Sequence, residues 1–122
     1  MKYAALLTNL AEDVETWEKM SPEEAQAVRA EEVPKWEALF GELGSIGALA
    51  FGVELDNPST AKTVRVRDGQ TIVTDGPFAE TKEQIGGVLV LQCEDLDQAI
   101  LIAARVPVVH RASVELRPLV ER

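Results

Sequence analysis

Three short segments of the chain are apolar at nearly every position, without the alternation that marks a strand with one wet face. They span residues 2–8, 46–55 and 88–93, and each predicts a strand buried on both sides. A fourth segment, ASVELRPL at residues 112–119, does alternate. It predicts a strand with two faces of different character, one carrying Val114 and Leu116 and the other Ser113, Glu115 and Arg117.

The stretch TVRVRDGQTIVTDG, residues 63–76, predicts a β-hairpin. Val64 and Val66 alternate with arginines, and the Asp68-Gly69 pair that follows has the composition of a two-residue turn. The second strand returns through the apolar pair at residues 72–73.

A long helix is predicted from its start signals near residue 21. Ser21 can cap the helix, Pro22 suits its first position, and Glu24 completes a capping box. An apolar stripe follows, and two glycines, Gly41 and Gly44, should mark the end. A proline at position 34 lies inside this stripe and should kink or break the helix.

A second helix is predicted over EDLDQAILIAARV, residues 94–106. Asp95 stands at the cap position and Gln98 at the position of a capping box. The residue just before this segment, Cys93, belongs to an apolar strand and should be a small buried hydrophobe. The two tryptophans, Trp17 and Trp36, should serve as core or lid residues, since no basic groove accompanies them.

The predicted order is strand, helix, strand, hairpin, strand, helix, strand. Without the hairpin this is the βαββαβ order of a ferredoxin-like α+β fold with an antiparallel sheet, and residues 1–122 should form one domain. Two helices can cover only one face of such a sheet, yet three strands are apolar on both faces. We therefore expect a second copy to cover the other face, giving a homodimer with a dimeric α+β barrel.

Composition narrows the classes of function. A formal charge of −9 disfavours non-specific nucleic-acid binding. One cysteine and one histidine exclude a disulfide framework, a multi-cysteine zinc site and a histidine-rich metal site, so no cofactor or metal is predicted. The first apolar run is too short for a secretory signal, and no stretch could span a membrane. The expectation is a cytoplasmic protein without membrane or nucleic-acid partners.

The run DGPFAETKEQIGG, residues 75–87, together with the hairpin before it and the segments DLDQAILIAARVP and SVELRP, resembles the YCII-related proteins and their DGPF subgroup. The resemblance spans nearly the whole chain. It implies a ferredoxin-like fold that dimerises into an α+β barrel, as in muconolactone isomerase-like proteins, and a bacterial cytoplasmic protein with an enzymatic or small-molecule-binding role. It also implies a link to alternative sigma factors.

In the broader family a histidine near the first strand and an aspartate form an acid–base pair at the barrel cleft. Here the first strand carries Tyr3, Thr8 and Asn9 and no histidine, so that Asp75 alone matches the pair. The subgroup often carries an aromatic residue after the double glycine, where this chain has Val88 and Leu89.

Asp75 is the first candidate for catalysis on physical grounds as well. A turn-forming aspartate ordinarily accepts a hydrogen bond from the backbone N–H two residues on, but that residue is Pro77, which has none. A carboxylate on a stiff turn with spare acceptor capacity suits a general base or a ligand anchor. The alternative is that Asp75 accepts a hydrogen bond from the amide of Phe78 or Ala79 and only fixes the loop.

His110 is the second catalytic candidate, because histidine is the residue type that changes charge near neutral pH. Thr81 and Gln84 should cap one helical turn that ends at the double glycine, residues 86–87. The candidates for ligand binding are Arg65, Phe78, Lys82, Glu115 and Arg117. Phe78 could instead pack into the protein, and the charged candidates could instead be solvated surface groups.

Two hypotheses of function follow. In the first, the barrel cleft binds a small anionic or carbonyl metabolite, and if the protein is an enzyme, it performs metal-independent lyase or isomerase chemistry with Asp75 as acid–base. In the second, the protein is a non-enzymatic regulatory or interaction module linked to transcription. The acidic first helix, with Glu23, Glu24, Glu31 and Glu32, would then contact a protein partner.

Overall fold

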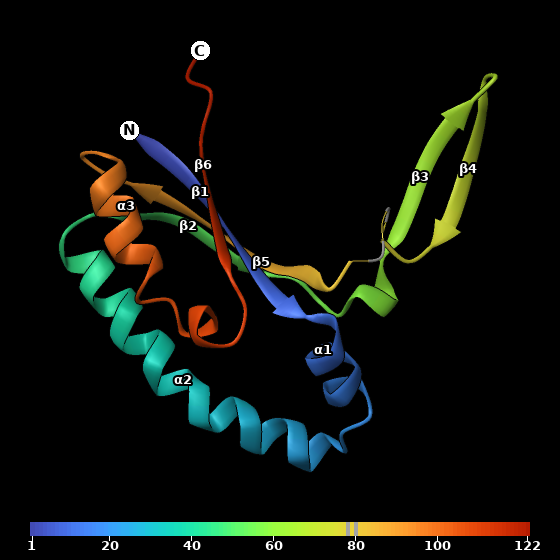
Figure 1. The fold of residues 1–122 in the computed structure, drawn as a ribbon, viewed down its shortest axis with the longest axis horizontal. Helices are drawn as coiled ribbons and strands as arrows, with labels where there is room; N and C mark the ends of the chain where they lie inside the picture. The colour runs from blue at the N-terminus through green and yellow to red at the C-terminus, as the bar shows by residue number, and fades with distance from the viewer. Residues whose placement is uncertain (78, 80) are drawn as a thin grey trace.

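A four-stranded antiparallel sheet forms the centre of the molecule (Figure 1). The computed structural model describes residues 1–77, 79 and 81–122. The sheet has the order β2-β5-β1-β6, built from β1 (Lys2–Leu10), β2 (Leu49–Glu54), β5 (Glu83–Gln92) and β6 (Val114–Pro118). The remaining strands, β3 (Lys62–Arg67) and β4 (Gln70–Asp75), pair only with each other.

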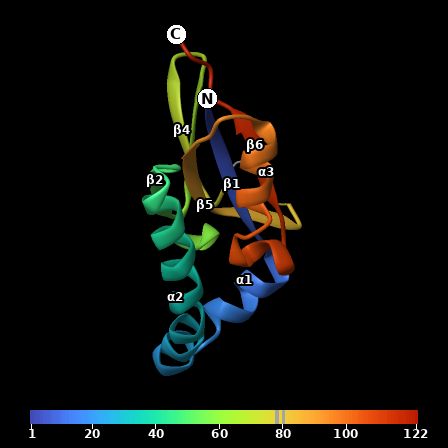
Figure 2. The same ribbon diagram turned by 90° about the vertical axis from the view of Figure 1, so that its left-hand side faces the viewer.

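The helices α2 (Pro22–Ser45) and α3 (Leu96–Ala103) lie on one side of this sheet (Figure 2). Their predicted caps are confirmed. Ser21 Oγ accepts a hydrogen bond from the Glu24 amide at 3.1 Å, and Asp95 Oδ1 accepts one from the Gln98 amide at 2.9 Å. The element order and the sheet order confirm the ferredoxin-like α+β fold with an inserted hairpin.

The short helix α1 (Ala11–Glu18) was not predicted from the sequence. It follows β1 without a break, its N-cap position is Leu10, which offers no capping side chain, and only Val14 is buried. Two short 3₁₀ turns, η1 (Pro58–Thr60) and η2 (Pro107–His110), complete the chain. None of the described helices is long and apolar enough to cross a membrane.

The predicted break of α2 at Pro34 does not occur, whereas the helix does end beside the predicted Gly44. The helix continues through Pro34 and through Gly41 and Gly44 to Ser45, and it curves along its length (Figure 1). Pro34 lies on the exposed side of the helix, so water can hydrate the backbone carbonyl that the proline ring leaves without a partner. The left-handed residue comes later, at Gly47, with φ of 68°.

The predicted helical turn at residues 81–84 is also wrong, because β5 begins at Glu83. Gln84 Nε2 does donate to the Thr81 carbonyl at 3.1 Å, but along an extended backbone. The pairing of β5 with β1 shifts register opposite Leu7 and Thr8, and Gly86 is the extra residue. A Cβ atom at Gly86 would collide with the side-chain amide of Asn9, which would have to turn away to admit a larger residue at the bulge.

The core lies between the sheet and the helices. Every second residue of β1 and β5 points into it, and residues of α2, α3 and η2 close it. Cys93 is buried beside these residues, as predicted, and Trp36 packs against them. The buried side chains include Tyr3, Ala5, Leu7, Leu39, Leu43, Leu89, Leu91, Ala99, Ile102, Val106 and Val108.

The opposite face of the sheet is apolar and uncovered by any described element. The strand register places Phe51 opposite Val90 and Val53 opposite Val88 on this face, and 57 % of Phe51 is exposed. Leu6 and Ala4 of β1 lie on the same face. We call this surface, formed by alternate residues of four strands, the open face: Ala4, Leu6, Phe51, Val53, Val88, Val90, Glu115 and Arg117.

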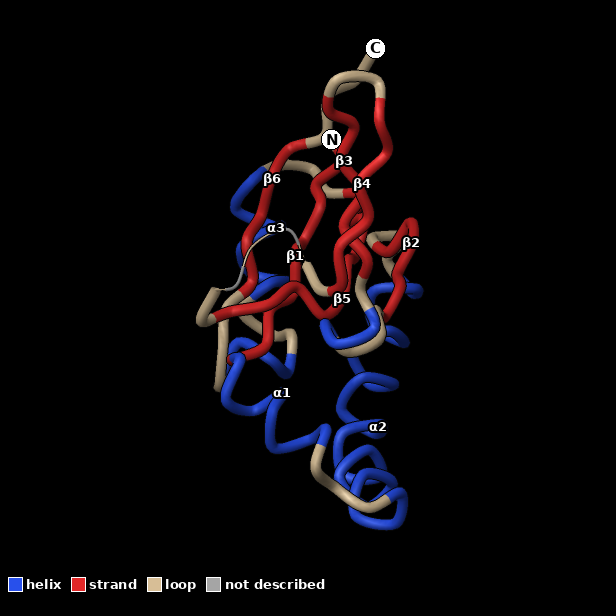
Figure 3. The backbone as a smooth tube through the Cα atoms, turned by 90° about the vertical axis from the view of Figure 1, so that its right-hand side faces the viewer, coloured by secondary structure: helices blue, strands red, loops and turns tan. Residues whose placement is uncertain are grey.

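The β3–β4 hairpin stands away from the sheet and from the helices (Figure 1), and it lies in front of the sheet when the molecule is viewed from that end (Figure 3). Its turn is as predicted, with Asp68 and Gly69 both left-handed at φ of 53° and 74°. The register puts Val64, Val66 and Val73 on one face of the hairpin, and all three are exposed. A two-stranded hairpin is marginally stable on its own, so this valine face is a second apolar surface without a partner in the described chain.

Candidate functional site

Asp75 lies at the base of the hairpin, where its carboxylate pairs with the Lys62 ammonium. The two residues are directly opposite each other in the ladder of β3 and β4. Gly76 follows in a left-handed conformation with φ of 91°, its N–H donates to the Ala61 carbonyl at 2.8 Å, and its carbonyl accepts from Thr63 Oγ1 at 2.7 Å. The partner of the carboxylate is therefore across the hairpin.

Lys62 could have been found from the sequence. A two-residue turn at 68–69 pairs residues whose numbers sum to 137, which places 62 opposite 75. The side chain of Asp75 is 86 % exposed, and Asp75 lines neither of the two hollows described below. In an isolated chain this is a surface ion pair, worth less than about 1 kcal/mol.

Glu115 and Arg117 form an ion pair on the edge strand β6. They stand opposite Leu6 and Ala4, which puts both charges on the open face, as the alternation of this strand predicted. A second arginine–glutamate pair of similar exposure, Arg29 and Glu54, joins α2 to β2 on the helix side at 2.7 Å. The two faces of the sheet thus each carry one exposed arginine–glutamate pair.

Two other predicted ligand-binding residues lie apart from this pair. Arg65 is on the hairpin, opposite Ile72 and on the face away from the valines. Lys82 precedes β5 with an exposed side chain, and its backbone carbonyl accepts a hydrogen bond from the Ala11 amide at 2.7 Å, which fixes the start of α1. Phe78 lies outside the described residues.

His110 lies on the helix side of the sheet, at the end of η2, and its side chain is exposed. It lines a hollow of about 340 Å³ between α2 and η2. Asp75, at the hairpin base, does not line this hollow. A single chain therefore does not bring the two predicted catalytic residues together.

Arg111, which sequence reasoning missed, organises the same hollow. Its guanidinium makes a bidentate pair with Glu32, with Nη1–Oε1 and Nη2–Oε2 distances of 2.6 and 3.4 Å, and lies 5.8 Å from the centre of the Trp17 ring. This contact ties α1, α2 and the segment before β6 together. The residues are 79 positions apart in sequence, so no local pattern could reveal the pair.

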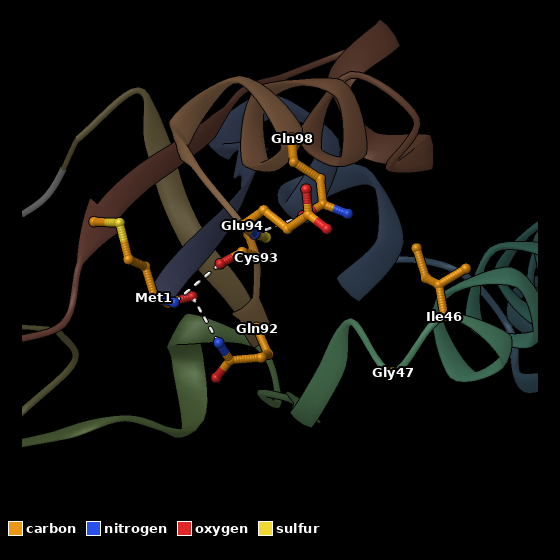
Figure 4. Close-up of a pocket in the computed structure, with 7 residues that line it drawn as sticks. All are labelled: Met1, Ile46, Gly47, Gln92, Cys93, Glu94 and Gln98. Carbon is orange, nitrogen blue, oxygen red and sulfur yellow. Dashed lines mark hydrogen bonds between the residues drawn. The ribbon is translucent and has the colours of Figure 1, made fainter.

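A second hollow, of about 370 Å³, lies between the end of β5 and the turn after α2 (Figure 4). The hydrogen bonds in this hollow satisfy backbone groups. The amino group of Met1 donates to the Cys93 carbonyl at 2.9 Å, and the Glu94 amide donates to Gln98 Oε1 at 2.7 Å. Burial raises the pKa of the Cys93 thiol, which makes it a poor nucleophile. Within residues 1–77, 79 and 81–122, no three acidic, histidine or cysteine side chains cluster as metal ligands would.

The chain matches the family of the YCII-related domain over residues 1–122. It is also 35 % identical over 121 residues to the uncharacterized protein R00369 of Rhizobium meliloti (strain 1021), which covers 98 % of this chain and 92 % of the relative. Both matches run through the open face, the hairpin and the double glycine of β5. This chain belongs to the YCII-related family.

Proposed function

We propose that this protein is a cytoplasmic homodimer that binds a small organic anion or carbonyl compound between two facing sheets. The first support is the open face. Antiparallel sheets tolerate one wet face when it is polar, but here Leu6, Val88, Val90 and Phe51 form an apolar surface. Two such faces packed about 10 Å apart would bury one another and leave a cleft at their margin.

The hairpin supports the same assembly. Its valine face (Val64, Val66 and Val73) is a second exposed apolar surface, on an arm that stands away from the body (Figure 1). A second copy on the open face would give that arm a surface to pack against. This packing would stabilise a hairpin that is only marginally stable in isolation.

The observation that carries the ligand proposal is the Glu115–Arg117 pair at the edge of this apolar face. A guanidinium presents parallel N–H donors that match a carboxylate, and its attraction for anions grows when neighbouring apolar groups exclude water. In the dimer the pair would border the cleft, so Arg117 would hold the anionic group and Glu115 would orient Arg117.

A catalytic role for Asp75 is the finer part of the proposal. As acid–base in metal-independent lyase or isomerase chemistry, it would exchange a proton with a substrate carbon next to a carbonyl, while Lys62 holds the carboxylate in place. Asp75→Asn should then abolish turnover and leave binding and folding intact. Equal turnover in Asp75→Asn and wild type would reduce Asp75 to a structural residue of the hairpin base.

The ligand proposal can be tested with the two matched arginines. We expect a thermal-shift screen of small mono-, di- and 2-oxocarboxylates to find stabilising compounds for wild type and for Arg29→Gln, but not for Arg117→Gln. Both variants remove one guanidinium of similar exposure, on opposite faces of the sheet. A ligand whose effect survives Arg117→Gln undiminished would refute this site.

A contact surface for a protein partner is the second candidate, and one observation favours it. Only Leu39 and Leu43 of α2 are buried, so the first half of this helix contributes no buried side chain, and it exposes Glu23, Glu24 and Glu31. The fourth predicted glutamate, Glu32, is instead engaged by Arg111. A complex with a transcription protein that is lost on reversing the three exposed charges, in a dimer that binds no metabolite, would favour this function.

A further inference from the structure

The hollow between α2 and η2 has an unusual charge for this protein. Four of its lining residues are basic or imidazole side chains, Lys35, Arg105, His110 and Arg111, and only one is acidic, Glu32. The whole chain carries a formal charge of −9. Like charges brought together on a surface repel, so a local excess of cations in an acidic protein marks a place where an anion would be stabilised.

Both guanidiniums of the hollow are held in place by carboxylates. Arg111 forms an ion pair with Glu32 and lies over the Trp17 ring, and its side chain is about one-third exposed. Arg105 pairs with Glu42, which lies about two helical turns further along α2 than Lys35. A guanidinium has five N–H donors, so each arginine keeps donors free after binding its carboxylate.

Lys35 and His110 supply a positive group and a polar group that form no ion pair within the described chain. None of the ion pairs within the described chain includes Lys35, whereas the one carboxylate that lines the hollow is bound through both oxygens to Arg111. The volume of about 340 Å³ is at the lower end of the range of small-molecule sites.

We propose that this hollow is a binding site for a phosphate-type dianion, either inorganic phosphate or the phosphate group of a small metabolite. Lys35 and His110 would contact the oxygens directly, and Arg105 and Arg111 would add donors that are already oriented. The site is on the helix side of the sheet, away from the open face, so it is independent of the cleft proposed above.

The test is an NMR titration of the full chain with inorganic phosphate at constant ionic strength, kept constant with potassium chloride. We expect saturable shifts at residues of the hollow on α2 and η2 and none on the open face. Lys35→Glu should weaken binding at least about tenfold, because it removes a contact and adds repulsion. Lys2→Glu changes the net charge equally from an exposed position on β1, and should weaken binding less than about twofold.

Lys35→Gln keeps the test informative if the charge reversal disturbs α2, with an expected loss of about fivefold. Glycerol phosphate and acetate are titrated in parallel to identify the natural ligand. If that ligand is a phosphorylated metabolite, glycerol phosphate should bind at least as well as inorganic phosphate. If it is inorganic phosphate, that ion should bind better than glycerol phosphate. No saturable response, tighter binding of acetate than of phosphate, or equal losses in Lys35→Glu and Lys2→Glu would overturn the proposal.

Discussion

The two faces of the central sheet are built from the same kinds of residue, yet only one of them is packed. On β5, Leu91 is completely buried against the helices, whereas its neighbour Val90 points to the open face and remains partly exposed. On β1 the same contrast separates Ala5 and Leu7 from Ala4 and Leu6. The difference between the faces is thus not hydrophobicity but the presence of a covering layer.

This contrast gives the apolar pattern of a strand a definite meaning. A strand that is apolar on both sides indicates two covering layers, and the helices of this chain supply one of them. The open face indicates the second layer, which we attribute to another copy of the chain. The predictions below separate the packed face from the open one, beginning with the largest expected effect.

Shortening a core residue should cost far more than shortening its neighbour on the open face. Leu91→Ala should lower the free energy of unfolding by about 2–5 kcal/mol, because it leaves a cavity in a fully buried site. Val90→Ala should cost under about 1 kcal/mol in the dissociated chain, since the removed methyl groups are already partly hydrated. Urea denaturation at protein concentrations low enough to separate subunits measures both. Equal losses would mean that the two faces are equally packed within one chain.

Cys93 reports on the packed face without a change of sequence. Burial raises the pKa of its thiol above the ordinary value of 9.0, so at pH 8 we expect a thiol reagent to label the folded chain at least about 100-fold more slowly than the urea-unfolded chain. Because the folded pKa is the higher one, this thiol's contribution to stability is intact below pH 9 and is lost as pH rises through the folded pKa. That extra loss, relative to Cys93→Ala, should appear in denaturation curves above pH 9. Rapid labelling of the native chain would contradict the burial.

Removing the two helix caps should lower the free energy of unfolding by different amounts, because α3 packs on the core from its first turns and α2 does not. Asp95→Ala should lower the free energy of unfolding by about 1 kcal/mol, since α3 packs through Ala99 and Ile102 on the core. Ser21→Ala should cost less than about 0.5 kcal/mol, because the start of α2 can fray without opening the core around Leu39. Hydrogen exchange should show the Ser21→Ala effect only in the first turns of α2. A larger global loss for Ser21→Ala would mean that the first half of α2 has a partner.

Most of the fold could be predicted because its signals are local. The hairpin turn at Asp68-Gly69 and the caps at Ser21 and Asp95 are each set by residues within a few positions of one another. The errors arose where tertiary contacts outweigh local preference. Gln84 has the spacing of a cap, but pairing with β1 draws the segment into β5.

The candidate sites were harder to predict, because their parts are far apart in sequence. The alternation of β6 correctly placed Glu115 and Arg117 on the face away from the core, and a cross-strand count would have supplied Lys62 for Asp75. Nothing local joins Glu32 to Arg111, since they meet only when η2 packs against α2. The residue type of His110 suggests acid–base chemistry, but its surroundings are set by the tertiary fold.

The most direct test of the account is a sedimentation-equilibrium comparison of wild type with two charge insertions. Phe51→Asp changes an exposed residue of the open face, and Leu101→Asp changes an even more exposed residue, at 68 %, on α3. At about 10 µM we expect dimers for wild type and Leu101→Asp, and a folded monomer for Phe51→Asp, because burying an unpaired charge in an apolar interface is strongly unfavourable. A monomeric wild type, or a Phe51→Asp variant as dimeric as wild type, would contradict the claim that a second copy covers the open face.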